Sequence, residues 1–156
     1  MIITWTIINN EIDFIQDILD WHLPFVDGMY FLDTGSTDGT LEILNKAAED
    51  HPNKVKVERY HISYTTEYEK DWEAMANPFP EVEVRNFALK RAEKLFKPTW
   101  FIQLDGDEIF LPHIAQIIKQ NPNSAIISGS TINPVCPLSE HPLEQRKGNQ
   151  FYDPHP

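Results

Sequence analysis

Cysteine, positive charge and long apolar runs are all scarce in this chain. The single Cys136 excludes an internal disulfide and predicts a reducing, intracellular (cytoplasmic) setting. The 13 basic residues are outnumbered by 24 acidic ones, and the net charge of −11 argues against a nucleic-acid-binding surface or docking on anionic lipid. No apolar run approaches the ~20 residues of a membrane span, and Met1–Trp5 lacks the basic start of a signal peptide. A polyanionic ligand would therefore need local compensation by a metal ion, an arginine or backbone N–H groups.

What the chain does contain is a regular alternation of apolar segments. With 156 residues and 41% hydrophobic residues it is long enough for one domain with a real core. Short β-branched runs alternate with segments of helical period, which predicts an α/β fold: a mostly parallel, Rossmann-like sheet with helices on both faces. A long polar and aromatic segment is expected to be a functional loop, and the Pro-rich end to be irregular. The predicted strands are 2–8, 28–32, 55–60, 100–104 and 124–130; the predicted helices are 12–23, 41–51, 81–97 and 112–120; the loop is 63–80, and the irregular end follows residue 133.

The stretch Trp100–Glu108 carries the most informative pattern. An apolar run, expected to be a central strand buried on both faces, ends in Asp105 and Asp107. Residues i and i+2 of an extended chain project to the same side, so both carboxylates should reach the crevice beyond the strand end. Gly106 between them lets a ligand approach the backbone. Carboxylate oxygens suit Mg²⁺ or Mn²⁺, although a lone Asp-x-Asp is a weak motif and a solvated turn is the plain alternative.

Polar residues also follow the other predicted strands. Asn9, Asn10 and Glu11 follow the first strand, where they can cap the next helix, and Asp33 follows the second. Residues 33–39 could offer hydroxyls and backbone N–H groups to a ligand, and Arg85 could pair with a diphosphate. Each has a structural alternative: a turn cap for Asp33, a helix cap for Asp38 in the same segment, and an ion pair with Glu81 or Glu83 for Arg85.

Taken together, these segments resemble a known family. Asn-Glu after the first strand, Leu-Asp-Thr-Gly-Ser-Thr-Asp-Gly-Thr after the second, and Arg-Asn-Phe-Ala-Leu ahead of Phe-Ile-Gln-Leu-Asp-Gly-Asp-Glu resemble family 2 nucleotide-sugar glycosyltransferases with the GT-A fold. The resemblance covers residues of about 2 to 130. It implies sugar transfer from a nucleoside diphosphate donor with a bound divalent metal ion. It further implies that Asp107 ligates the metal, Asp105 faces the ribose or a metal-bound water, Asp33 hydrogen-bonds the base, Arg85 lies near the diphosphate, and Ile8, Asn9 and Glu11 line the base and ribose pocket.

The chain departs from that family in two places. Many members carry Asp-Asp where this chain has Asp33-Thr34, and the acceptor half that supplies the general base is represented by only about fifty residues after Asp107. We therefore expect one domain over 1–156, a minimal or truncated version of the fold. Residues 1–131 would bind the nucleotide-sugar and 132–156 would begin the acceptor part. The catalytic base is unassigned, with Asp153 as a candidate.

The expected function is therefore a metal-dependent, inverting glycosyltransferase that uses Mn²⁺ or Mg²⁺, a nucleotide-sugar and an unknown acceptor. Two other functions stay open. A nucleotidyltransferase on a similar scaffold would release pyrophosphate, but such enzymes usually carry a Gly-rich, basic loop where this chain has Asn9-Asn10-Glu11. A catalytically silent nucleotide-sugar-binding module would bind without turnover. The six histidines show no spacing for a zinc site, although His155 is a possible late ligand.

Overall fold

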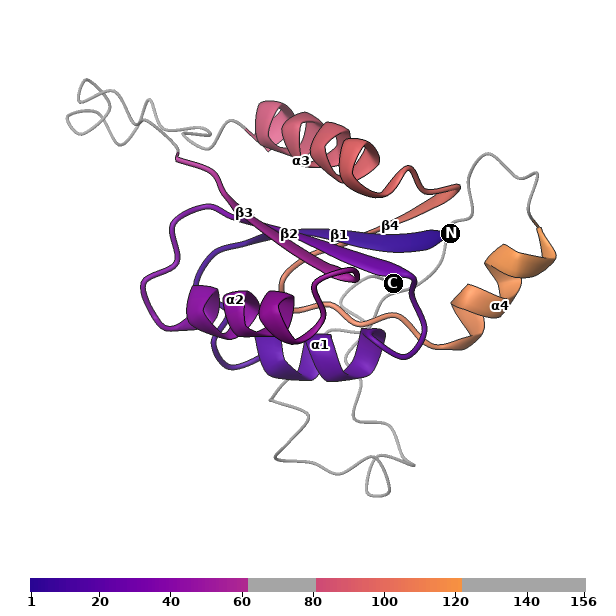
Figure 1. Ribbon diagram of the computed structural model, residues 1–156, viewed down its shortest axis with the longest axis horizontal. Helices are drawn as coiled ribbons and strands as arrows, with labels where there is room; N and C mark the ends of the chain where they lie inside the picture. The colour runs from indigo at the N-terminus through magenta and orange to yellow at the C-terminus, as the bar shows by residue number, and fades with distance from the viewer. Residues whose placement is uncertain (62–80, 122–156) are drawn as a thin grey trace, which may run out of the picture.

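Four parallel strands form one sheet in the part of the chain that the computed structural model describes, which is residues 1–61 and 81–121 (Figure 1). The predicted α/β class is confirmed. The expected loop 63–80 and strand 124–130 lie outside the described residues. The elements in chain order are β1 (Ile2–Ile8), α1 (Ile15–His22), β2 (Gly28–Asp33), α2 (Thr40–Asp50), β3 (Val55–Arg59), α3 (Glu81–Phe96), β4 (Trp100–Leu104) and α4 (His113–Gln120).

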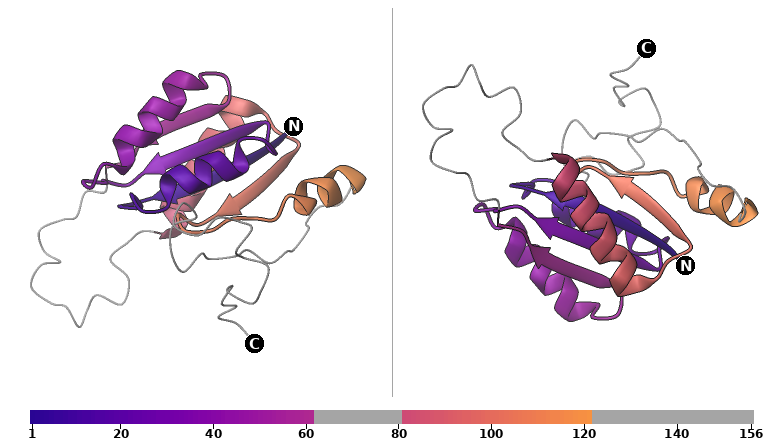
Figure 2. Two further views of the ribbon diagram at one scale, coloured as in Figure 1. Left: turned by 90° about the horizontal axis from the view of Figure 1, so that it is seen from below. Right: turned by 90° about the horizontal axis from the view of Figure 1, so that it is seen from above.

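The strand order is β3-β2-β1-β4, so the direction in which the sheet grows reverses between β1 and β4. In β1, Ile3 is in register with Gly28 of β2 on one side and with Phe101 of β4 on the other. Helices α1 and α2 cover one face of the sheet, and α3 covers the opposite face (Figures 1 and 2). This arrangement follows from right-handed crossovers, because a chain that reverses its direction across a parallel sheet must place its next helix on the other face.

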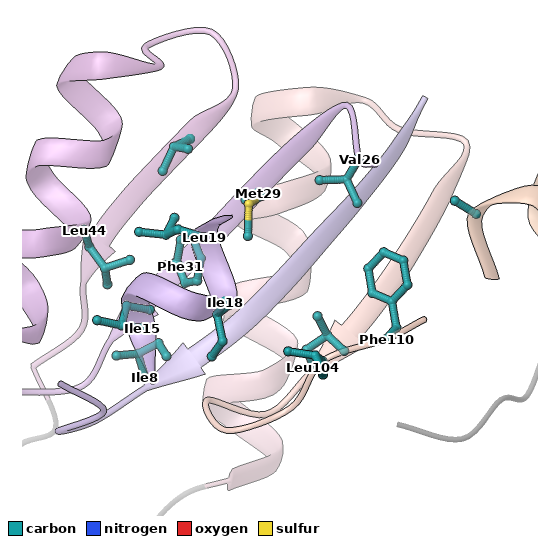
Figure 3. Packing of buried hydrophobic residues seen from close by; sticks show 13 residues of the cluster. Ile8, Ile15, Ile18, Leu19, Val26, Met29, Phe31, Leu44, Leu104 and Phe110 are labelled. Atoms are coloured by element: carbon teal, nitrogen blue, oxygen red, sulfur yellow. The ribbon is translucent and has the colours of Figure 1, made fainter. Parts of the chain in front are cut away.

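The two faces of the sheet bury separate apolar clusters. Met29 and Phe31 of β2 point toward α1 and α2, where they pack with Ile15, Ile18 and Leu44 and other side chains of that cluster (Figure 3). Alternate residues of the strands face α3 instead and pack on the small side chains that this helix turns toward the sheet. Strands covered on both faces must be apolar at nearly every position, which explains why β1 and β2 read as continuous hydrophobic runs.

Two expectations about these elements are wrong. Within the described residues β4 pairs only with β1, and its side chains are half-buried except for exposed Gln103 and buried Leu104, so β1 and β2 are the strands buried on both faces. Helix α1 begins at Ile15, without a side-chain cap from the residues that follow β1. Asn10 has a φ of 57°, which asparagine tolerates better than most residues, and therefore forms a turn ahead of the helix. Within residues 1–61 and 81–121, none of the helices has the length and apolar character needed to cross a lipid bilayer.

His22 at the end of α1 is a fully buried ionisable side chain in the core. Its ring stacks on Phe110 with the centroids 4.6 Å apart, and Nε2 accepts the Phe110 backbone N–H at 3.2 Å. The neutral ring must therefore carry its proton on Nδ1. Burial lowers the pKa of His22 from 6.5 to about 4, and the Ile18 carbonyl opposes only part of that effect.

We predict that this histidine makes the fold acid-sensitive. As the pH falls below 6.5, the unfolded chain takes up a proton at His22 that the folded chain refuses until about pH 4, so stability is full above about pH 7 and is lost across that window. The free energy of unfolding should fall by about 2 kcal/mol between pH 7.5 and 5 from this group. Urea denaturation of His22→Gln should show a smaller pH dependence, whereas His51→Gln, at an exposed histidine, should keep it. Equal pH profiles for both variants would contradict the assignment.

Candidate functional site

A cavity of about 560 Å³ opens at the carboxyl edge of the sheet, where the strand order reverses between β1 and β4. Ligands of open α/β proteins bind at such reversal points. Residues from both strand ends, from the loop after β2 and from the start of α3 contribute to the cavity wall. The lining residues are Ile7, Ile8, Asn9, Glu11, Thr34, Glu81, Arg85, Asp105, Gly106 and Asp107. Every predicted site residue within the described part of the chain is among them except Asp33; the candidate base Asp153 and the possible ligand His155 lie outside it.

The segment after β4 is a turn that brings Asp105 and Asp107 to the cavity. The Glu108 N–H donates to the Asp105 carbonyl at 3.2 Å, and the Asp105 N–H donates to the Glu108 carboxylate at 2.9 Å. The prediction of an extended chain here is therefore wrong, although both aspartates still line the same space. A Cβ added at Gly106 would lie 2.7 Å from Cγ of Glu11, so a larger residue here would displace the Glu11 side chain.

Acidic groups dominate the electrostatics of the cavity wall. Burial raises the pKa of Glu11, and the charges of Asp107, Asp38 and Asp13 raise it further. Arg85 is the cation of the lining: its Nε donates to Glu81 at 2.8 Å and its Nη2 to Asp105 at 3.4 Å. Burial lowers the pKa of Arg85, but the two carboxylates outweigh that effect and leave the pKa above its ordinary value. The ion pair with Glu81 foreseen as an alternative is present, and the same guanidinium also lines the cavity.

The donor set fits a hard divalent cation better than zinc. Asp105 and Asp107 supply carboxylate oxygens, and none of the described histidines lines the cavity. Within residues 1–61 and 81–121, no group of three or more His, Cys, Asp or Glu residues is arranged to hold a metal ion. Mg²⁺ is commonly held by one or two carboxylates together with water and substrate phosphates, so two aspartates are a sufficient protein contribution.

Asp33 does not face the cavity, and the prediction that it reads a base needs correction. Its side chain is 0% exposed, its two oxygens accept the N–H groups of Gly35 and Ser36 at 3.1 Å, and Arg59 pairs with it at 3.4 Å. The physical reason is strand parity. Asp33 has the same orientation as Phe31 and Met29, which point toward the face covered by α1 and α2. The turn-cap alternative therefore describes Asp33 in this structure.

Thr34 takes the place in the cavity wall that was expected for Asp33. Its hydroxyl donates to the Ile8 carbonyl at 3.0 Å and accepts the Asn9 side-chain amide at 3.2 Å. The wall next to the end of β1 is consequently neutral, formed by aliphatic, amide and hydroxyl groups. The sequence could have predicted that Thr34 lines the cavity, because it follows Asp33 directly and its side chain therefore points to the opposite side of the strand.

Residues 36–40, which run from the segment after β2 to the first residue of α2, bind the neighbouring loop, and none of them lines the cavity. Ser36 Oγ accepts the Asn10 N–H at 2.9 Å, and Thr40 Oγ1 accepts the Glu11 N–H at 2.9 Å. The Asp38 carboxylate accepts the Ile12 N–H at 3.1 Å. The expectation that the hydroxyls and N–H groups of this segment face a ligand is therefore wrong for these residues. These side chains fix the backbone that carries Glu11. The sequence pattern that could have predicted this role is the run of short polar residues, because such side chains often hydrogen-bond to nearby backbone groups.

We predict different effects for substitutions at the adjacent positions 33 and 34. Asp33→Asn removes a charge that accepts one buried and one partly buried hydrogen bond and pairs with Arg59, so the free energy of unfolding should fall by about 2 kcal/mol in urea denaturation. Thr34→Val should cost about 1 kcal/mol or less, because its side chain is only half-buried. Calorimetry with uridine and adenosine diphosphates should show a changed preference in Thr34→Val and an unchanged one in Asp33→Asn. The reverse pattern would restore Asp33 as the residue that reads the base.

Comparison with known proteins does not indicate which chemistry this cavity performs. No protein-family model matches the sequence, and the search of curated proteins found no match. The cavity-lining residues and the motif resemblance are therefore the features that bear on function.

Proposed function

We propose that this protein is a metal-dependent glycosyltransferase that moves a sugar from a nucleoside diphosphate donor to an acceptor. The observation that carries the proposal is the composition of one cavity: the Asp105–Asp107 turn, the guanidinium of Arg85 and the neutral groups of Ile8, Asn9 and Thr34 all line the space at the reversal point of the sheet. The order of the motifs along the chain, which resembles family 2 enzymes of the GT-A fold, supports the same function.

The charges of the lining residues give the proposed cation its role. Four carboxylates, Glu11, Glu81, Asp105 and Asp107, line the cavity with one guanidinium, so a diphosphate placed here without a cation would meet net repulsion. Asp107 and Asp105 would hold Mn²⁺ or Mg²⁺. When bound, the ion would neutralise charge on the departing nucleoside diphosphate. Arg85 would pair with the phosphate oxygens in a charge-assisted contact.

The remaining lining residues suit the nucleoside part of the donor. Ile7 and Ile8 supply an apolar surface for the base and ribose, while Asn9 and Thr34 supply neutral donors and acceptors. In the proposed inverting reaction a carboxylate takes the proton of the acceptor hydroxyl. The acceptor oxygen then bonds to the anomeric carbon as the bond from that carbon to the phosphate oxygen breaks. The base for this step is not assigned among the described residues.

We predict that the metal dependence of nucleotide binding resides in Asp107. Calorimetry with uridine diphosphate should show binding that tightens by about tenfold or more when Mn²⁺ is added, because an anion in an acidic cavity needs a compensating cation. Asp107→Asn should lose that gain while it stays folded. The matched control is Asp50→Asn, the same change at an exposed position that pairs with Lys46 at the far end of α2.

Three results would argue against this proposal. If Asp107→Asn keeps the Mn²⁺ effect of the parent, the cation binds elsewhere. If binding is normal but no nucleoside diphosphate is released from a panel of nucleotide-sugars with acceptors or with water, the protein is a silent binding module. Release of pyrophosphate from a nucleoside triphosphate and a sugar phosphate would instead identify a nucleotidyltransferase.

A further inference from the structure

Arg85 is held by two carboxylates of different origin. Asp105 belongs to the turn after β4, where the proposed cation would bind. Glu81 lies one turn before Arg85 in α3, at the i,i+4 spacing that favours a Glu-to-Arg pair, and its Oε1 is 2.8 Å from Nε of Arg85. This second contact is the shorter one, and it comes from a residue to which neither the motif resemblance nor the proposed chemistry gives a role.

The geometry makes Glu81 a competitor for any anion that reaches Arg85. A guanidinium binds phosphate through a pair of adjacent N–H donors, and here the Nε–H of Arg85 already donates a hydrogen bond to Glu81. Glu81 also lines the cavity, so its charge faces a bound anion directly. The pair is accessible to water, with side-chain exposures of 32% for Arg85 and 47% for Glu81. Exchange of a partially solvated partner is cheap, because such ion pairs contribute little net free energy.

We propose that Glu81 is a specificity-determining counter-ion of Arg85, which lowers the affinity of the site for anions that arrive without a divalent cation. A metal-free diphosphate must displace Glu81 and also withstand its repulsion. A diphosphate that brings Mn²⁺ or Mg²⁺ carries less net charge, so Glu81 repels it less and it depends less on displacing Glu81 from Arg85. The ligand class that this arrangement selects is a metal-complexed diphosphate, in preference to free phosphate or metal-free nucleotide. The inference rests on the proposed function only in placing a diphosphate beside Arg85.

The matched control is Glu83→Gln, two residues along the same helix turn. Glu81 and Glu83 both lie in the first turn of α3, so either substitution removes one negative charge and the same favourable interaction with the helix dipole. The Glu83 carboxylate accepts a hydrogen bond from the Tyr60 hydroxyl at 3.4 Å and does not line the cavity. Comparing the two variants therefore isolates the contact with Arg85 from general effects of charge and helix stability.

The experiment is calorimetric titration of inorganic pyrophosphate in EDTA, and of uridine diphosphate with and without Mn²⁺. Glu81→Gln should bind metal-free pyrophosphate about three- to tenfold more tightly than Glu83→Gln does, because one exposed ion pair and one adjacent like charge are removed. The factor by which Mn²⁺ improves uridine diphosphate binding should shrink in Glu81→Gln only. In a background of Arg85→Gln, the difference between the two glutamate variants should shrink to the part that comes from direct repulsion of the anion by Glu81, and the double-mutant cycle measures the part that acts through Arg85.

The outcomes separate this inference from the proposed function. If Glu81→Gln binds pyrophosphate no more tightly than Glu83→Gln, or shows no detectable binding, Glu81 is not a competing counter-ion, and a weakened affinity would make it a residue that positions Arg85. Those results leave a metal-dependent nucleotide site intact if Asp107→Asn still abolishes the Mn²⁺ effect. Conversely, a tighter Glu81→Gln combined with an unchanged Mn²⁺ effect in Asp107→Asn would uphold the counter-ion and overturn the proposed metal site.

Discussion

The parallel pairing of β1 with both β2 and β4 is the constraint on which the rest of the structure depends. It aligns the carboxyl ends of three strands at one edge, and it reverses the direction of the sheet next to β1. Because of that reversal, α1 and α3 lie on opposite faces of the sheet (Figure 2), and the cavity lies beyond the carboxyl ends of β1 and β4. The acidic turn after β4 and the arginine of α3 meet there, although about twenty residues of sequence separate them.

The same cavity concentrates charge of one sign where the sheet offers little to neutralise it. Arg85 is the cation of the cavity wall, and the first turn of α3, which carries Glu81, adds the positive end of a helix dipole. Two of the wall's acids already bind the arginine. Arg85 can therefore either keep these internal ion pairs or pair with an external anion, and a small change in the charge of the wall can shift that balance.

The sequence was sufficient for the fold class and for most of the cavity wall, because strand runs, helix periods and strand-end polar residues are local signals. It failed where the outcome depended on direction or on tertiary contacts. Asp33 ends β2 and Asp105 follows β4, yet Asp33 shares the parity of Phe31 and binds Gly35, Ser36 and Arg59, whereas Asp105 shares the parity of Phe101 and pairs with Arg85 of α3. Counting alternate residues from a known core position would have separated them. The partial exposure of β4 and the bonds from residues 36–40 to the preceding loop required the assembled structure.

The hydrogen bonds between the loops after β1 and β2 also bear on how this protein can change. Three consecutive backbone N–H groups, of Asn10, Glu11 and Ile12, donate to side chains of the loop after β2 and of the first residue of α2. A loop exchange that replaced either segment alone would leave those donors without partners and would release Glu11 from its place beside Gly106. The two segments are therefore one structural unit, and engineering that keeps the sheet must still exchange them together.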